Sequence, residues 1–95
     1  MEKLKRILLV EDDPKDIELT LNSLNQNNLV NETVVARDGV EALDYLYRRG
    51  IFADRMEGNP VVILLDLKMP RMDGIQMLKH LKSDDKIARI PVVIL

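Results

Sequence analysis

The apolar residues of this chain fall first into short continuous runs. Residues 7–10 and 92–95 contain four consecutive apolar residues, residues 61–65 contain five, and residues 33–36 form a shorter segment rich in β-branched residues. Runs of this length are typical of strands that are buried on both faces of a parallel sheet. We therefore predict four strands at these positions.

The segments between these runs carry apolar residues at helical spacing. Each helical segment begins just after an aspartate with the spacing of an N-cap, namely Asp13, Asp38 and Asp73. Residues 49–60 are mostly polar and are predicted to form a long surface loop. The three predicted helices are residues 14–26 with an apolar face of Ile17, Leu21 and Leu24, a second helix with Val40, Leu43, Leu46 and Tyr47 that stops at Gly50, and a third with Ile75, Leu78 and Leu81 that is closed by residues 83–86.

The alternation of strands and helices predicts an α/β fold. Continuous apolar strands separated by amphipathic helices indicate a parallel sheet with helices on both faces and right-handed crossovers. A chain of 95 residues is long enough for one such domain and too short for two.

Composition excludes several classes of protein. The chain has no cysteine, so a disulfide framework, a Cys-ligated zinc site and a thiol nucleophile are excluded, and a cytoplasmic location is expected. A net charge of −2 with only three aromatic residues argues against a nucleic-acid surface. The apolar runs are far shorter than the ~20 residues of a membrane span, and residues 1–6 lead into no signal-peptide core, so no membrane association is expected.

Acidic residues follow two of the predicted strands. Glu11 and Asp12 come directly after the first strand, and Asp66 ends the third. Ligands of open parallel sheets bind at the carboxyl ends of the strands, so three carboxylates meet at one point if these strands are neighbours. Repulsion between them is relieved by a proton or by a hard cation, and Mg²⁺ is the natural candidate. Asp66 caps no helix, which favours a functional role.

Other kinds of site fit the residues less well. A dinucleotide or Walker-type phosphate loop needs glycines after the first strand, where this chain has acids. A magnesium-dependent phosphatase often carries a second aspartate two residues after its nucleophile, and that place is Lys68 here. His80 has no second histidine beside it and is expected on a solvated helix face. Met69, Met72 and Met77 are expected to fill the core or turns.

Three motifs together resemble the receiver domain of two-component response regulators. They are ILLVEDDP at residues 7–14, ARDGVEAL at residues 36–43 and LLDLKMPRMDG at residues 64–74. The resemblance covers essentially all of residues 1–95 and implies a flavodoxin-like doubly wound sheet with the strand order 2-1-3-4. It implies a phosphoacceptor signalling domain rather than an enzyme.

The resemblance also implies roles for individual residues. Asp66 is expected to accept a phosphoryl group from a phosphohistidine of a sensor histidine kinase. Asp12, Asp66 and the backbone carbonyl of Lys68 are expected to bind Mg²⁺, with Glu11 acting mainly through water. A carboxylate attacks phosphorus poorly until a divalent cation neutralises both groups. The long loop after the second helix is similar to that of single-domain regulators paired with phytochrome-type kinases.

The family pattern extends beyond the fourth strand. It continues with a Thr or Ser and with a Lys after a fifth strand, whereas this sequence ends at Leu95. The expectation is therefore a receiver domain that is incomplete at its C-terminus and lacks the fifth strand and the last two helices. Cation binding should survive, and phosphorylation should be impaired.

Residues 91–95 would then form an uncharged apolar edge of the sheet. Such an edge favours self-association, exchange of elements between copies, or origin as part of a larger or fused protein. Two other functions remain open: a binding or scaffold fragment that takes no phosphate, and a magnesium-dependent phosphotransferase or phosphatase.

Overall fold

The chain folds around a four-stranded parallel sheet. A computed structural model describes residues 6–26, 32–68 and 73–95. The strands are β1 (Arg6–Val10), β2 (Glu32–Ala36), β3 (Val62–Leu65) and β4 (Val92–Ile94), and their order is β2-β1-β3-β4. The predicted parallel sheet and its order 2-1-3-4 are confirmed.

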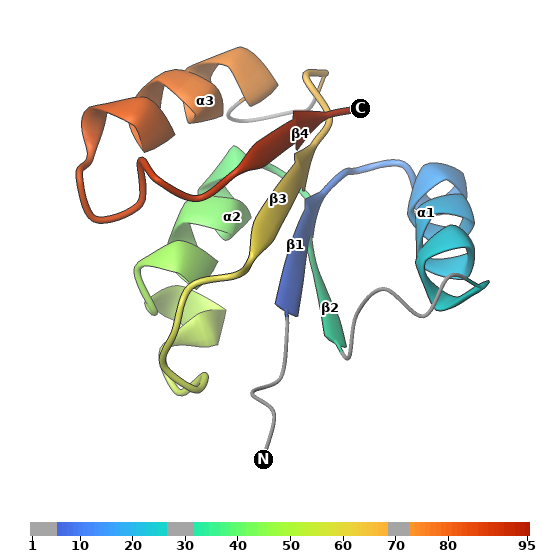
Figure 1. Ribbon diagram of the computed structural model, residues 1–95, viewed down its shortest axis with the longest axis horizontal. Helices are drawn as coiled ribbons and strands as arrows, with labels where there is room; N and C mark the ends of the chain where they lie inside the picture. The colour runs from blue at the N-terminus through green and yellow to red at the C-terminus, as the bar shows by residue number, and fades with distance from the viewer. Residues whose placement is uncertain (1–5, 27–31, 69–72) are drawn as a thin grey trace.

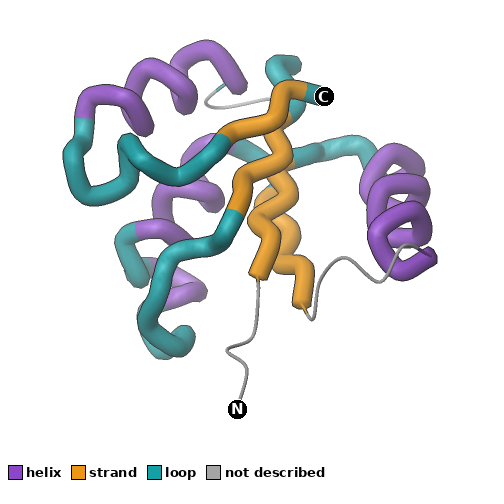
Figure 2. Tube along the Cα trace, in the orientation of Figure 1, coloured by secondary structure: helices purple, strands orange, loops and turns teal. Residues whose placement is uncertain are grey.

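Helices lie on both faces of this sheet, as Figures 1 and 2 show. They are α1 (Pro14–Gln26), α2 (Gly39–Leu46) and α3 (Gly74–Ser83), with a short 3-10 helix η1 (Gly50–Phe52) after α2. The helices α2 and α3 cover one face, and α1 lies on the other. Within the described parts of the chain, none of these helices combines the length and the apolar character that crossing a membrane requires.

The predicted aspartate caps are present at all three helices. The Oδ1 atom of Asp13 accepts a hydrogen bond from the backbone N–H of Lys15 at 2.8 Å. Asp38 and Asp73 accept equivalent bonds from the third residue after each, at 2.8 and 2.9 Å. Each cap satisfies a backbone donor that the first helical turn leaves without a partner, which fixes where the helix begins.

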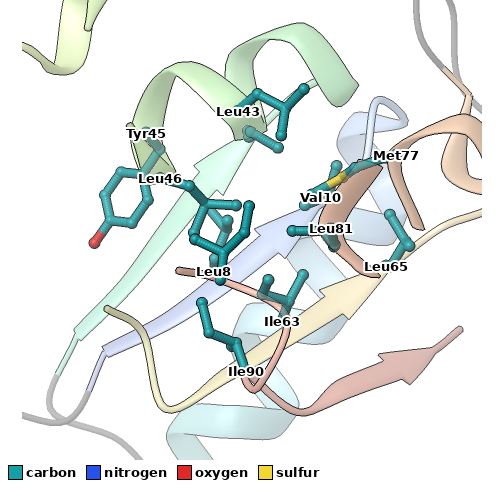
Figure 3. Packing of buried hydrophobic residues seen from close by; sticks show 13 residues of the cluster. Leu8, Val10, Leu43, Tyr45, Leu46, Ile63, Leu65, Met77, Leu81 and Ile90 are labelled. Carbon is teal, nitrogen blue, oxygen red and sulfur yellow. The ribbon is translucent and has the colours of Figure 1, made fainter. Parts of the chain in front are cut away.

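The main hydrophobic core lies between the sheet and the helices α2 and α3 (Figure 3). Two details of the predicted apolar faces were wrong. Ile75 is 53% exposed, and the buried residue near the start of α3 is Met77, which confirms the core role expected of that methionine. In α2, Tyr45 is buried although the predicted face omitted it. Met69 and Met72 lie outside the described residues.

The end of α2 also differs from the prediction. The helix ends at Leu46 rather than continuing to Gly50, with Tyr47 as its C-cap. The N–H of Arg49 donates to the carbonyl of Asp44 at 2.9 Å, and the N–H of Arg48 donates to the carbonyl of Tyr45 at 3.2 Å. This is a Schellman motif with Arg48 at the left-handed position, φ 55°. The motif closes the helix before the glycine, and Gly50, with φ 60°, starts η1 instead.

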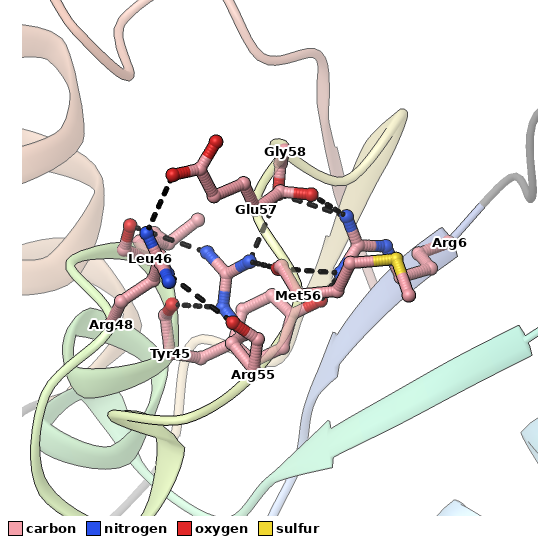
Figure 4. Close-up of polar contacts among 8 residues, drawn as sticks. All are labelled: Arg6, Tyr45, Leu46, Arg48, Arg55, Met56, Glu57 and Gly58. Atoms are coloured by element: carbon pink, nitrogen blue, oxygen red, sulfur yellow. Dashed lines mark hydrogen bonds and ion pairs between the residues drawn. The ribbon is translucent and has the colours of Figure 1, made fainter.

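Two arginines hold the loop between η1 and β3 (Figure 4). The guanidinium of Arg55 donates to the carbonyl oxygens of Tyr45 and Met56, both at 2.6 Å, and of Gly58 at 3.0 Å. It also lies over the ring of Tyr45, 4.1 Å from the centroid. Arg6, at the start of β1, donates to the carbonyls of Met56 and Gly58 and to that of Glu57. The predicted surface loop is thus exposed in most of its residues but held in place by side chains.

Candidate metal centre

Backbone pairing brings the acidic residues of two strands side by side. β1 and β3 pair in parallel with Val10 opposite Leu65, so Glu11 and Asp66 follow at the same edge. The N–H of Asp66 donates to the carbonyl of Val10 at 3.0 Å, and the N–H of Glu11 donates to that of Ala36 at 2.9 Å. These bonds extend the sheet ladder by one residue on each strand. The position of both carboxylates is therefore fixed by strand register.

The structure brings Glu11, Asp12 and Asp66 together. One carboxylate oxygen of each residue lies within 4.8 Å of the other two. Glu11 is buried, and Asp12 and Asp66 are half-buried. The backbone N–H of Asp13 donates to Oε1 of Glu11 at 3.1 Å, and the N–H of Lys68 donates to Oδ1 of Asp66, also at 3.1 Å. These contacts orient two of the three carboxylates.

Burial and like charge both act on Glu11. Removal from water raises the pKa of the Glu11 carboxyl above its ordinary value of 4.5, while the hydrogen bond from the N–H of Asp13 opposes this. The negative charges of Asp66 and Asp16 raise this pKa further. The cluster therefore holds its negative charge at a cost in free energy, which a proton or a cation relieves.

A cavity of about 380 Å³ opens on the cluster. It gives solvent and small solutes a path to the carboxylates of Glu11 and Asp66. Asp16 and Thr20 of α1 also line it, and the sequence reasoning did not identify them. Their spacing of four residues, on the helix that starts just after the acidic pair, places them on one helix face and was the signal available. The cavity is lined by Glu11, Asp16, Leu19, Thr20, Asp66 and Leu95.

The other residues considered from the sequence lie in different surroundings. Lys68 is exposed two residues after Asp66, and its amide contact with Asp66 links it to the cluster. His80 is exposed on α3, as expected, and its Nε2 lies 3.3 Å from the hydroxyl of Tyr47. It contributes nothing to the acidic cluster.

The donor set fits a hard divalent cation. Three carboxylates offer only oxygen atoms, which Mg²⁺ and other hard cations prefer, and they come from two strand ends whose spacing the sheet fixes. Asp66 and Glu11 line the cavity, which leaves room for water to complete the coordination of a cation. Among the described residues no histidine joins the cluster, and the chain has no cysteine, so the set does not favour a softer metal.

Comparison with known proteins gives consistent matches along the chain. A sequence model of the response regulator receiver domain matches residues 7–95. The response regulator Rcp1 of Synechocystis sp. is 37% identical over 91 residues, which are 96% of this chain and 60% of that protein. The chain therefore spans less than two thirds of the length of this curated relative.

Solved structures of similar proteins share the fold. The bacteriophytochrome response regulator RtBRR has a TM-score of 0.92 and 54% identity, covering 97% of this chain and 55% of that one. The Mn²⁺-bound form of Rcp1 has a TM-score of 0.85 and 37% identity, covering 95% and 63%. The strand order, the acidic cluster at the carboxyl edge and these matches agree, and the chain belongs to the response regulator receiver domain family of two-component signalling.

Proposed function

We propose that this chain is a phosphoacceptor in a two-component phosphorelay and that Asp66 takes the phosphoryl group. The observation that carries the proposal is the meeting of the Glu11, Asp12 and Asp66 carboxylates beside an open cavity. Asp66 has the position a nucleophile needs, because it directly follows a central strand and its Oδ1 is oriented by the amide of Lys68.

The donor is a phosphohistidine of a sensor histidine kinase. A carboxylate oxygen of Asp66 forms the new bond to phosphorus while the bond from phosphorus to the imidazole nitrogen breaks. The electron pair of that bond stays on the nitrogen, which takes up a proton from solvent, and Asp66 becomes an acyl phosphate. The described cluster consists of carboxylates with no histidine, and the protein contributes positioning and charge neutralisation.

A divalent cation completes the site. Asp12, Asp66 and the backbone carbonyl of Lys68 would hold Mg²⁺, with Glu11 contributing through water. When bound, the cation supplies charge neutralisation between the carboxylate and the phosphoryl oxygens. A divalent cation is consistent with the related Rcp1, whose structure was solved in a Mn²⁺-bound form.

The kinase is of the phytochrome type. This part of the proposal rests on the relatives, since RtBRR is named a bacteriophytochrome response regulator and RcpA a cyanobacterial phytochrome response regulator. RcpA is 42% identical to this chain.

Intact mass spectrometry tests the proposal. The chain is incubated with Mg²⁺ and a small phosphoryl donor such as acetyl phosphate, and a phosphoryl adduct is expected. The adduct should disappear in Asp66→Asn and remain in the matched control Asp54→Asn, which changes an exposed aspartate in the loop after η1. No adduct in a folded protein that binds Mg²⁺ would favour a scaffold role, and turnover of an external phosphate ester would favour a phosphatase.

We further infer that the chain self-associates through residues 91–95. β4 pairs with β3 on one side and has no partner strand on the other among the described residues. Val93, Ile94 and Leu95 are each about half exposed. An unpaired apolar strand is a template for pairing with a second copy.

Sedimentation velocity at increasing concentration tests this association. A dimer or larger species is expected for the unmodified chain, and Val93→Lys should shift the distribution to monomer. Ile51→Lys, which changes an equally apolar and more exposed residue away from β4, should leave it unchanged. A monomer at every concentration would contradict the inference.

A further inference from the structure

Gly74, the first residue of α3, lies directly against the backbone that follows β3. A Cβ atom at Gly74 would lie 2.4 Å from Cα of Leu67 and 2.5 Å from the carbonyl oxygen of Asp66. Non-bonded carbon atoms separate by about 3.5 to 4.0 Å. Both neighbours are backbone atoms, so no side-chain rotation removes the conflict.

The need for glycine here is one of space. Gly50 and Gly58 have positive φ angles, whereas Gly74 does not, so a residue with a side chain could adopt its backbone conformation. Its N–H donates to the carbonyl of Leu67 at 3.0 Å. The start of α3 is thus joined to the residue just after Asp66 by a hydrogen bond and by direct backbone contact.

The helix α3 is held in place more strongly than the backbone segment that follows β3. Asp73 caps it through the N–H of Gln76, and Met77 and Leu81 anchor it in the core. The segment from Asp66 to Lys68 belongs to no helix or strand, and Lys68 is exposed. The N–H of Asp66 is bonded to the carbonyl of Val10 in the sheet, so an increase in the distance between α3 and this backbone moves Leu67 and Lys68 rather than the helix or the end of β3.

We propose that Gly74 is a positioning residue for the acidic cluster. By letting α3 approach the backbone of Asp66 and Leu67, it sets the direction of the Asp66 carboxylate and the place of the Lys68 amide that donates to it. This inference rests on the proposed cation site, because the consequence of misplacing Asp66 is weaker cation binding. A purely structural role would instead lower stability and leave the affinity of the folded protein unchanged.

Gly74→Ala separates the two roles. Isothermal titration with Mg²⁺ should give a dissociation constant at least tenfold higher than that of the unmodified chain, measured where both proteins are folded. The amide signal of Lys68 in a two-dimensional NMR spectrum without metal should move. Leu81→Ala is the matched control, since it removes a buried side chain near the other end of the same helix, away from the backbone that Gly74 approaches. It should destabilise the protein, keep the Mg²⁺ affinity and leave the Lys68 signal in place.

A measurement on the unmodified chain covers the case in which Gly74→Ala does not fold. Addition of Mg²⁺ should slow hydrogen exchange of the Lys68 and Gly74 amides together, while the Glu41 amide at the start of α2 stays unchanged. Slowing at Lys68 without slowing at Gly74, or unchanged Mg²⁺ affinity in a folded Gly74→Ala, overturns the proposal. No Mg²⁺ binding by the unmodified chain would instead overturn the proposed function at its first step, before any variant is compared.

Discussion

At the carboxyl edge of the sheet three carboxylates face one another, whereas at the amino edge two guanidinium groups face backbone carbonyl oxygens. The first group is Glu11, Asp12 and Asp66, whose repulsion the fold itself does not relieve. The second is Arg6 and Arg55, whose N–H groups are used in hydrogen bonds to the loop before β3. Both edges concentrate like charge on a small protein.

The difference lies in what satisfies each charge. Burial lowers the pKa of Arg55, with smaller contributions from the positive charges of Arg6 and Arg48, yet carbonyl dipoles and the Tyr45 ring compensate for it within the chain. Glu11 and Asp66 each accept a backbone hydrogen bond, but in the described parts of the chain no positively charged side chain forms an ion pair with the three acids. The amino edge therefore serves to hold the loop in place, whereas the carboxyl edge is where we propose that a cation binds.

Arg55→Ala is the change with the largest expected effect on this comparison. It removes the charge-assisted hydrogen bonds to the carbonyl oxygens of Tyr45, Met56 and Gly58, each of which keeps one other donor, and it removes the contact with the Tyr45 ring. We expect a loss of about 3 kcal/mol in the free energy of unfolding. Urea titration measures it. Arg49→Ala, which removes the surface ion pair with Asp44 at 2.8 Å and a contact with the Tyr47 ring, should cost less than about 1 kcal/mol. Equal costs would mean that the arginines do not hold the loop.

Asp12→Asn probes the opposite edge. Removing one charged carboxylate from the proposed site should weaken Mg²⁺ binding by roughly tenfold or more. Even the loss of a residue that only hydrogen-bonds to a metal ligand typically lowers metal affinity by about 10- to 100-fold. Stability without metal should change little, because the substitution also removes repulsion. Calorimetric titration of Asp12→Asn beside Arg55→Ala sharpens the contrast, because the arginine variant should retain Mg²⁺ affinity.

Glu11→Gln should separate binding from stability. A carboxyl with a raised pKa holds its proton more tightly in the folded than in the unfolded chain, so the contribution of Glu11 to stability is greatest below pH 4.5 and falls as pH rises through the raised pKa. Without divalent cations the variant should lack this fall and be about 1 kcal/mol more stable at pH 7. Thermal unfolding in EDTA between pH 4 and pH 8 checks the sign. A wild-type stability that rises relative to the variant over this range would contradict it.

Tyr47→Phe has the smallest expected effect on stability. It removes a hydrogen bond that lies at neither edge of the sheet. The Tyr47 hydroxyl donates to Oδ2 of Asp84 and lowers the pKa of that carboxyl, assisted by the N–H of Lys86. Stabilisation from a lowered carboxyl pKa is present above 3.8 and is lost as pH falls through the folded value. The variant should raise the pKa of Asp84, seen in a carbon NMR titration of its carboxyl. An unchanged titration would show that the hydroxyl contact does not form.

Local patterns predicted the elements well because their causes are local. The strands followed from continuous apolar runs, and the helix starts followed from Asp13, Asp38 and Asp73, whose side chains bond within three residues. From the residues alone, the prediction that Glu11 and Asp66 lie close together depended on β1 and β3 being neighbours in the sheet. Only the resemblance to a family supplied that order in advance.

The missed features depend on distant contacts. Arg6 and Met56 are 50 residues apart in sequence, and nothing near either residue announces their hydrogen bond. Tyr45 was left off the buried face because its packing partners, Phe52 and Arg55, come from the following loop. The end of α2 was misplaced because Arg48 adopts a left-handed conformation that sequence rules assign to glycine.

The ladder bond from the N–H of Asp66 to the carbonyl of Val10 has a thermodynamic consequence. In the unfolded chain the acids of the two strands are separated by most of the sequence, so the site exists only while β1 and β3 remain paired. A ligand that requires this site binds the folded chain alone, and at 100 times its dissociation constant it adds about 2.7 kcal/mol to the free energy of unfolding. Ligand binding at the site and folding of the sheet are then coupled, so a change in one shifts the other.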